Sequence, residues 1–256
     1  MWSLGDYSRV AEVLEPHAEA LANACKIDVG TSVLDVAAGN GNFSLVAARR
    51  GAIVTATDIT PRMLELGRAR TAAFDAIQWS EADAEQLPFA DGSYDLVASV
   101  FGAMFAPRPR LVASEMFRVA KPGGLVAMAN YSHGGHLGRM ADLMAAFSTS
   151  PSYELPSPFL WGDEDEVRRR FGGFASSIEV AHRTLYFESA SVESFVDFWQ
   201  ATNAPIAALK AMAPPERYQE LLTKTAQLVE DLNESPDGRV KLGSPYILVL
   251  ARRPTL

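Results

Sequence analysis

The stretch of sequence that decides the fold reads Val33-Leu34-Asp35-Val36-Ala37-Ala38-Gly39-Asn40-Gly41-Asn42-Phe43. Its apolar, β-branched start predicts a buried strand, and Phe43, Val46 and Ala47 then follow at the spacing of one helix face. The two glycines between strand and helix allow the backbone to pass close to a ligand. Open α/β sheets bind ligands at the carboxyl ends of their strands, so we expect a ligand at this loop.

The same alternation of strand and helix continues on the C-terminal side of this stretch. Thr60 and Pro61 predict the start of a second helix, and Lys121–Gly124 predicts a turn before another strand. Such βαβ repetition is typical of a doubly wound α/β fold, and we expect a seven-stranded, mostly parallel sheet. The seven predicted strands are residues 33–37, 53–58, 77–83, 94–100, 125–132, 178–188 and 246–253.

The chain changes character after Tyr131. Residues 191–233 form a long helical pattern broken by Pro205 and by Pro214-Pro215, which is too long for a simple connection and predicts an inserted helical lid. We therefore expect a single domain over residues 1–256. Its predicted parts are an N-terminal helical cover over 1–30, a ligand-binding core over 31–132, an acceptor-side insert over 133–177 and a lid over 191–235.

Composition narrows the classes of partner. The 256 residues are 48% hydrophobic and 21% charged, which is ordinary for a globular protein, and the net charge of −8 argues against nucleic acid or an anionic membrane surface. The densest basic run, Arg168–Arg170, is predicted to be a solvated helix face. Cys25 is the one cysteine, so no disulfide can form within the chain. With no signal peptide and no long apolar run, we expect a cytoplasmic protein, and a homo-oligomer stays open.

Three predicted parallel strands each end in or beside an aspartate: Asp35, Asp58 and Asp83. Carboxylates clustered on one rim repel each other, so a cationic or donor-rich ligand is the natural explanation. Asp35, just before the glycine loop, would repel a pyrophosphate and suits an ammonium or a sulfonium. Asp58, about 20 residues after the loop, can accept hydrogen bonds from a ribose diol. A nicotinamide oxidoreductase is the alternative enzyme class. Its dinucleotide-binding loop requires a third small residue for helix packing, and Ser44 occupies that position here, which argues against this class. A purely structural role for Asp35 is a second alternative.

These motifs resemble those of class I S-adenosylmethionine (SAM)-dependent methyltransferases. Within that family, the chain is most similar to the branch of ubiquinone and menaquinone methyltransferases and bacterial natural-product enzymes. Three further segments support this closer likeness: Trp2–Tyr7, Phe101–Pro107 and Phe159–Gly162.

The resemblance implies SAM as cofactor and a role for each matching residue. The backbone of Gly39 and Gly41, together with Ala37, would lie against the methionine part of SAM. Asp35 would face the ammonium of that part, and Asp58 would bind the ribose. The adenine would lie on Ile59 and Met63, with its amino group at Asp83-Ala84. Val100 and Phe101 would flank the sulfonium, and Tyr7 would close over the cofactor.

The acceptor is less sharply indicated. The Asn/Asp-Pro-Pro-aromatic motif of many amino-group methyltransferases is absent after Val100, and aromatic residues near the predicted pocket favour a small apolar or aromatic acceptor, methylated on oxygen or carbon. His133 is the candidate general base and Tyr131 a candidate for orienting the acceptor. His17 has no supporting context, and the four scattered histidines predict no metal site. The alternatives are a relative that binds SAM but catalyses cyclisation or only binds, and an RNA methyltransferase, for which no basic appendage is visible.

Overall fold

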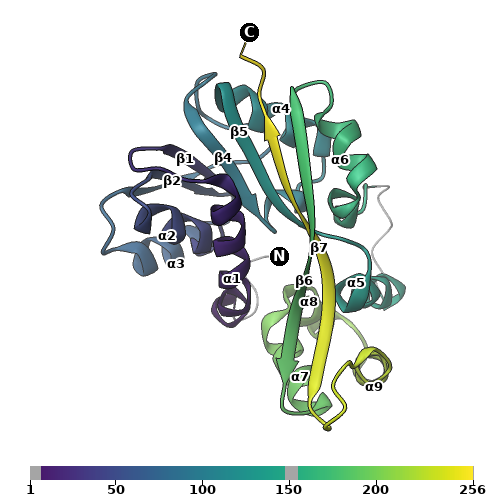
Figure 1. The fold of residues 1–256 in the computed structure, drawn as a ribbon. Helices are drawn as coiled ribbons and strands as arrows, with labels where there is room; N and C mark the ends of the chain where they lie inside the picture. Colours follow the sequence, from purple (N-terminus) through teal and green to yellow (C-terminus); the bar gives the residue numbers. More distant parts are fainter. Residues whose placement is uncertain (1–6, 148–154, 256) are drawn as a thin grey trace. The chain divides into compact units, whose positions relative to one another are not determined.

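Seven strands form one sheet in the described part of the chain, in the order β3-β2-β1-β4-β5-β7-β6 (Figure 1). The fold is seen in a computed structural model that describes residues 7–147 and 155–255. This architecture confirms the predicted doubly wound, mostly parallel sheet. The strands are β1 (Ser32–Val36), β2 (Ile53–Asp58), β3 (Ile77–Glu81), β4 (Tyr94–Val100), β5 (Ala120–Tyr131), β6 (Ser177–Ser189) and β7 (Val240–Arg252).

The order of the strands makes the end of β1 a topological switch point. β1 pairs in parallel with β2 on one side and with β4 on the other, so the chain reverses its direction of travel across the sheet at this point. β4 pairs in parallel with β5, and β7 then pairs antiparallel with β5. Ligands of open α/β sheets bind at such a switch point, outside the carboxyl ends of the strands.

The chain divides into two compact units. The larger contains Leu14–Tyr131, Leu155–Arg183 and Tyr246–Leu256, and the smaller contains Met1–Val13, Ser132–Glu154 and Thr184–Pro245. β1 to β5 belong to the larger unit, and β6 and β7 contribute residues to both. The glycine loop and the three aspartates therefore all belong to the larger unit.

The helices of the larger unit follow the sequence signals. α2 (Asn42–Arg49) starts directly after Gly41 and ends before Gly51, whose φ of 86° is the left-handed geometry of a helix stop. α3 (Pro61–Thr71) has Thr60 as its N-cap and a proline at its first position, as predicted. The remaining helices are most of α1 (Tyr7–Cys25), η1 (Ala103–Phe105), α4 (Pro109–Val119), η2 (Pro158–Gly162) and α6 (Glu164–Phe171).

The smaller unit is mainly helical. α5 (Gly135–Phe147) packs against α9 (Pro215–Leu232), which also packs against α7 (Val192–Thr202) and α8 (Ala204–Met212). The predicted breaks are confirmed, because α7 ends before Asn203 and α9 begins after Pro214. A proline lacks the backbone N–H that a helix interior needs and favours the first helical turn. This explains why α8 and α9 each begin at or next to a proline.

Four local expectations are wrong. β7 starts at Val240, although the sequence predicted a start at Tyr246. Residues 121–124 lie within β5, which starts at Ala120, and β3 ends at Glu81, two residues before Asp83. The run Arg168–Arg170 is solvated only in part. The side chain of Arg170 is 1% exposed and its guanidinium lies 4.5 Å from the ring of Trp161, because position 170 falls on the inner face of α6.

No helix in the described ranges is both long enough and apolar enough to cross a membrane.

Candidate functional site

The glycine loop has positive φ angles, a backbone conformation that is unfavourable for most residues. Ala37, Gly39 and Gly41 have φ values of 54°, 57° and 90°. A Cβ on Gly41 would stand 2.9 Å from the ring of Trp79, so side-chain crowding as well as φ requires glycine there. The loop thus places backbone atoms without bulky side chains at the carboxyl end of β1, directly before the start of α2.

Asp58 connects the end of β2 to this loop. One carboxylate oxygen accepts a hydrogen bond from the backbone N–H of Gly39 at 3.0 Å, and the other accepts from the backbone N–H of Thr60 at 2.8 Å. Burial raises the pKa of Asp58, and these backbone bonds oppose the rise. Each carboxylate oxygen has a second lone pair, so Asp58 can hold the loop and still accept from a diol.

Asp35 is a buried carboxyl at 1% exposure. Ser44 donates its hydroxyl to it at 2.6 Å, a contact that explains why a hydroxyl residue stands in the first turn of α2. Burial raises the pKa of Asp35 to about 7, Ser44 opposes the shift, and the nearby charge of Asp58 adds to it. An ionised pair at positions 35 and 58 is therefore held at an electrostatic cost that a cationic ligand would relieve.

The predicted adenine contacts flank the end of β2. Ile59 is 57% exposed, a high value for isoleucine, whereas Met63 is buried at the base of α3. Asp83 lies in a turn, where its carboxylate accepts from the backbone N–H of Glu85 at 2.9 Å, and Ala84 is buried. An exposed apolar side chain beside a buried one offers a surface on which a purine ring can lie.

The end of β4 is the second strained point of the rim. Phe101 has a φ of 53°, and a Cβ on the next residue, Gly102, would stand 2.2 Å from the carbonyl oxygen of Ala37. The ends of β1 and β4 are thus in backbone contact. Non-glycine residues with positive φ are costly and cluster at functional sites, which supports this edge as the working one.

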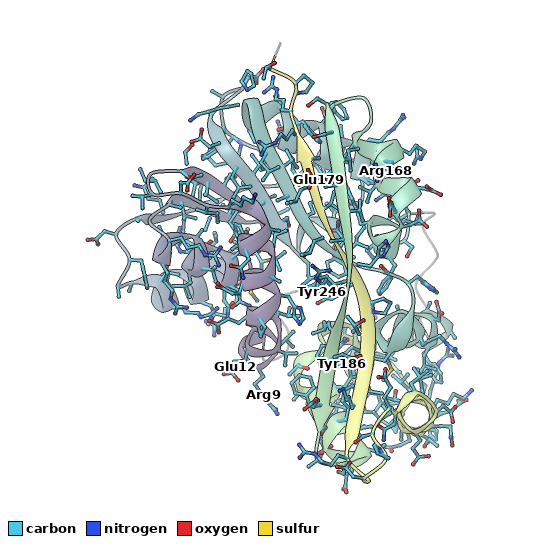
Figure 2. The ribbon with its side chains drawn as sticks, in the orientation of Figure 1. Arg9, Glu12, Arg168, Glu179, Tyr186 and Tyr246 are labelled. Atoms are coloured by element: carbon cyan, nitrogen blue, oxygen red, sulfur yellow. The ribbon has the colours of Figure 1, made fainter. Side chains whose placement is uncertain are left out.

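The ring of Phe101 stacks on that of Tyr131, with centroids 4.0 Å apart and planes 2° from parallel. Tyr246 of β7, labelled in Figure 2, meets the same phenyl ring edge-on at 5.4 Å, and His17 of α1 meets it at 6.1 Å. These four residues, Phe101, Tyr131, Tyr246 and His17, are called the aromatic cluster below.

Sequence reasoning missed half of the aromatic cluster. The Nδ1 atom of His17 is 3.0 Å from the hydroxyl oxygen of Tyr246, so the statement that His17 has no supporting context is wrong. The two residues are 229 positions apart, and no local spacing relates them. Arg70, which donates to the side-chain oxygen of Asn40 at 3.0 Å and so braces the loop, was missed for the same reason.

The other predicted residues are placed as follows. His133 belongs to the smaller unit, where its Nε2 is 3.1 Å from a carboxylate oxygen of Asp142 and its side chain is 59% exposed. Its role as base stays a prediction. The side chain of Tyr7 and all of Tyr153 lie outside the described residues. Within the described ranges, no three histidine, cysteine or acidic residues are grouped to hold a metal ion.

Comparison with known proteins decides the family. A family model described as a methyltransferase domain matches residues 34–128. A protein of Mycobacterium tuberculosis without an assigned function is 42% identical over 187 residues, 72% of this chain and 68% of the relative. A demethylmenaquinone methyltransferase of Clavibacter sepedonicus is 36% identical over 172 residues, 61% of this chain and 69% of that enzyme. The chain belongs to the class I SAM-dependent methyltransferases, in the menaquinone methyltransferase-like branch.

Solved structures of this methyltransferase fold agree. Phosphoethanolamine N-methyltransferase 2 of Haemonchus contortus, solved with S-adenosylhomocysteine, aligns with a TM-score of 0.59 at 17% identity, over 93% of this chain and 52% of that one. The cyclase SpnF also aligns with a TM-score of 0.59, at 16% identity over 94% of this chain and 81% of its own. At these identities the likeness shows a shared fold.

The acidic residues Asp35 and Asp58, at the ends of β1 and β2, fit SAM, the cofactor of the family. SAM supplies an activated methyl group on a cationic sulfonium and carries a second positive charge on its ammonium. Among the described residues, the groups that shift the pKa of the buried Asp35 carboxyl are Ser44 and Asp58, and neither is a cation; the ammonium of SAM would supply one. A pyrophosphate would instead add negative charge beside Asp35 and Asp58, which disfavours the nicotinamide alternative.

Proposed function

We propose that this methyltransferase acts on a small aromatic or apolar acceptor and methylates an oxygen or an activated ring carbon. The observation that carries the proposal is the aromatic cluster. It lines the carboxyl ends of β4 and β5, where Val100 and Phe101 are expected to flank the sulfonium. Aromatic rings pack favourably against a further flat ring in stacked or edge-on arrangements, which favours an aromatic acceptor.

The residue roles are proposed from the places that these residues are expected to take around that point. We expect the carboxylate of Asp58 to hold the ribose hydroxyls and that of Asp35 to attract the ammonium, so that the sulfonium is fixed beside Phe101. Tyr131 would orient the acceptor ring by stacking or by its hydroxyl. Methyl transfer is an in-line displacement, and a fixed donor and a fixed acceptor supply much of the rate by proximity and alignment.

The relatives favour a ring acceptor too. One 36% identical relative is named a demethylmenaquinone methyltransferase, and a second with that name is 41% identical over 113 residues. We infer a related acceptor chemistry for this chain: a hydroquinone, a phenol or a similarly activated ring.

The proposal is tested with SAM labelled in its methyl group and a panel of acceptors. The panel contains 1,4-naphthohydroquinone, a catechol, an aliphatic carboxylic acid and ethanolamine. The label should move to the hydroquinone or the catechol and not to ethanolamine. Transfer to the amine alone, or to no ring compound although SAM is bound, would refute the proposed acceptor class.

A second function is favoured by one observation, the alignment with the cyclase SpnF. In that case SAM would bind and remain intact. The labelled-SAM assay separates the two functions, because a cyclase leaves the methyl label on SAM after prolonged incubation with the whole panel.

A further inference from the structure

We propose that His17 is the general base of methyl transfer to a hydroxyl acceptor and that Tyr246 positions its imidazole ring. The inference rests on the proposed function, because it requires an acceptor that loses a proton. It assigns the base to α1 of the larger unit and replaces the sequence-based candidate, His133.

The position of His17 is the first argument. Its ring lies edge-on to Tyr246 with centroids 5.0 Å apart, and both rings contact the Phe101 ring that ends β4. The same phenyl ring stacks on Tyr131 at the end of β5. His17 therefore belongs to the cluster expected to flank the reacting methyl group.

The orientation of the imidazole also suits a base. Tyr246 is 2% exposed, and its hydroxyl oxygen is within 3.0 Å of Nδ1 of His17, so this side of the ring is fixed from the buried face. Among residues 7–147 and 155–255, the hydrogen bond found for the His17 ring is the one at Nδ1, and none is found at Nε2. When Nδ1–H donates to the Tyr246 oxygen, the Nε2 atom carries the lone pair that a base needs.

The charge state of the pair is the third argument. Burial lowers the pKa of His17 from its usual 6.5, so the ring is neutral at pH 7 and ready to accept a proton. Burial also raises the pKa of Tyr246, and the charge of Arg183 on β6 opposes that rise, so the phenol remains protonated. The titratable group that contacts the His17 imidazole in the described residues is thus the Tyr246 phenol, and the charged group that acts on this phenol is Arg183.

The chemical step then balances. The acceptor oxygen forms a bond to the methyl carbon of the donor as the bond between that carbon and sulfur breaks, and the electron pair of the broken bond returns to sulfur. The acceptor proton moves to Nε2 of His17. The resulting imidazolium keeps its Nδ1–H bond to the Tyr246 oxygen, and it later releases the proton to solvent on the partly exposed side of the ring.

His17→Asn is the sharpest variant, because its amide can keep a hydrogen bond to Tyr246 near the place of Nδ1 but cannot take a proton. We expect turnover of the catechol or the hydroquinone to fall by about 10²–10⁴-fold. Tyr246→Phe keeps the ring contacts and loses the hydroxyl, and one hydrogen bond of ordinary strength corresponds to a roughly tenfold loss. His182→Asn is the matched control, because His182 is a 71% exposed histidine paired with Glu164.

The pH profile separates chemistry from structure. The base acts only when neutral, so wild-type turnover should rise with pH through an acidic limb that lies below pH 6.5. The limb should vanish in His17→Asn and persist in His182→Asn. His133→Asn serves as the rival arm. Loss of the limb in that variant, with the limb kept in His17→Asn, would overturn the proposal.

Two readouts do not depend on turnover. Affinity for S-adenosylhomocysteine should stay within about threefold of wild type in His17→Asn, which shows that the fold and the cofactor site persist. Nitrogen NMR of labelled histidine, with S-adenosylhomocysteine and catechol bound, should show His17 as the neutral tautomer with its proton on Nδ1. A proton on Nε2 in that complex would overturn the proposal.

The outcomes distinguish this inference from the proposed function. If wild type methylates ring hydroxyls and His17→Asn does so at a similar rate, His17 is not the base while the function stands. If wild type binds SAM but methylates no hydroxyl in the panel, the inference fails. If it binds no SAM, the proposed function fails as well.

Discussion

Replacing Asp35 with asparagine should change how the stability of the protein depends on pH. Burial raises the pKa of Asp35 from 3.8 to about 7 in the folded protein. Between these two values the folded protein holds a proton that the unfolded chain has lost. The free energy of unfolding therefore falls as the pH rises, by about 1.4 kcal/mol per pH unit, and levels off above the folded pKa.

The size of the effect follows from that window. Between pH 5 and pH 8 the wild type loses about 2–3 kcal/mol through this one group. The Asp35→Asn side chain stays neutral throughout and can still accept the hydrogen bond that Ser44 donates. The variant should therefore gain about 2–3 kcal/mol over wild type when the pH is raised from 5 to 8. Titrating groups that do not interact with Asp35 cancel in this difference.

The assay is urea unfolding of the SAM-free protein at both pH values. Asp95→Asn is the matched control, because the Lys121 hydrogen bond, followed by that of Ser32, lowers the pKa of Asp95 to about 2. That carboxyl is ionised in the folded and the unfolded protein from pH 5 to 8, so its variant should differ from wild type by a constant amount. A constant difference for Asp35→Asn as well would refute the buried, electrostatically costly carboxyl described above.

Three further predictions concern the cofactor rim and the predicted lid. Asp58→Asn should weaken SAM binding at least tenfold by calorimetry, because charge-assisted bonds to the ribose are worth about 1.5–3 kcal/mol each; an affinity equal to that of wild type would remove Asp58 from the site. Gly41→Ala should lower stability by about 1 kcal/mol or more, because of its φ of 90° and the contact with Trp79. Gly173→Ala, where an added Cβ meets nothing within 4 Å, is its control, and equal unfolding midpoints would contradict the strain argument. Amide exchange in residues 191–235 should slow when S-adenosylhomocysteine and an acceptor bind together, since lids belong to the less stable parts of a fold; exchange unaffected by ligands would argue against a lid.

The fold was predictable because its signals are local. Buried parallel strands appear as short apolar runs, and Pro61, Gly51 and Pro215 mark helix boundaries through their own backbone limits. The last strand was expected to start at Tyr246 but begins at Val240. Its first half was missed because buried and partly exposed residues alternate there and because Gly-Ser-Pro, a sequence typical of turns, lies inside the strand.

The candidate site was predictable only in part. Asp35, Asp58 and the glycines stand at strand ends, so topology alone brings them to one rim. The hydrogen bond between His17 and Tyr246, and the strain at Phe101, depend on tertiary contacts between distant elements. Neither leaves a periodic trace in the sequence. The partial burial of His17 on α1 and its contact with Tyr246 of β7 are visible only in the folded chain.

We expect the carboxyl ends of β1, β2 and β4 to hold the cofactor beside the aromatic cluster. A crystal structure with S-adenosylhomocysteine bound tests it most directly. We predict both ribose hydroxyls within hydrogen-bond distance of the Asp58 carboxylate, the ammonium on the side of Asp35, and the sulfur next to Phe101. An adenosyl group bound elsewhere, or a ribose that makes no contact with Asp58, would contradict the account.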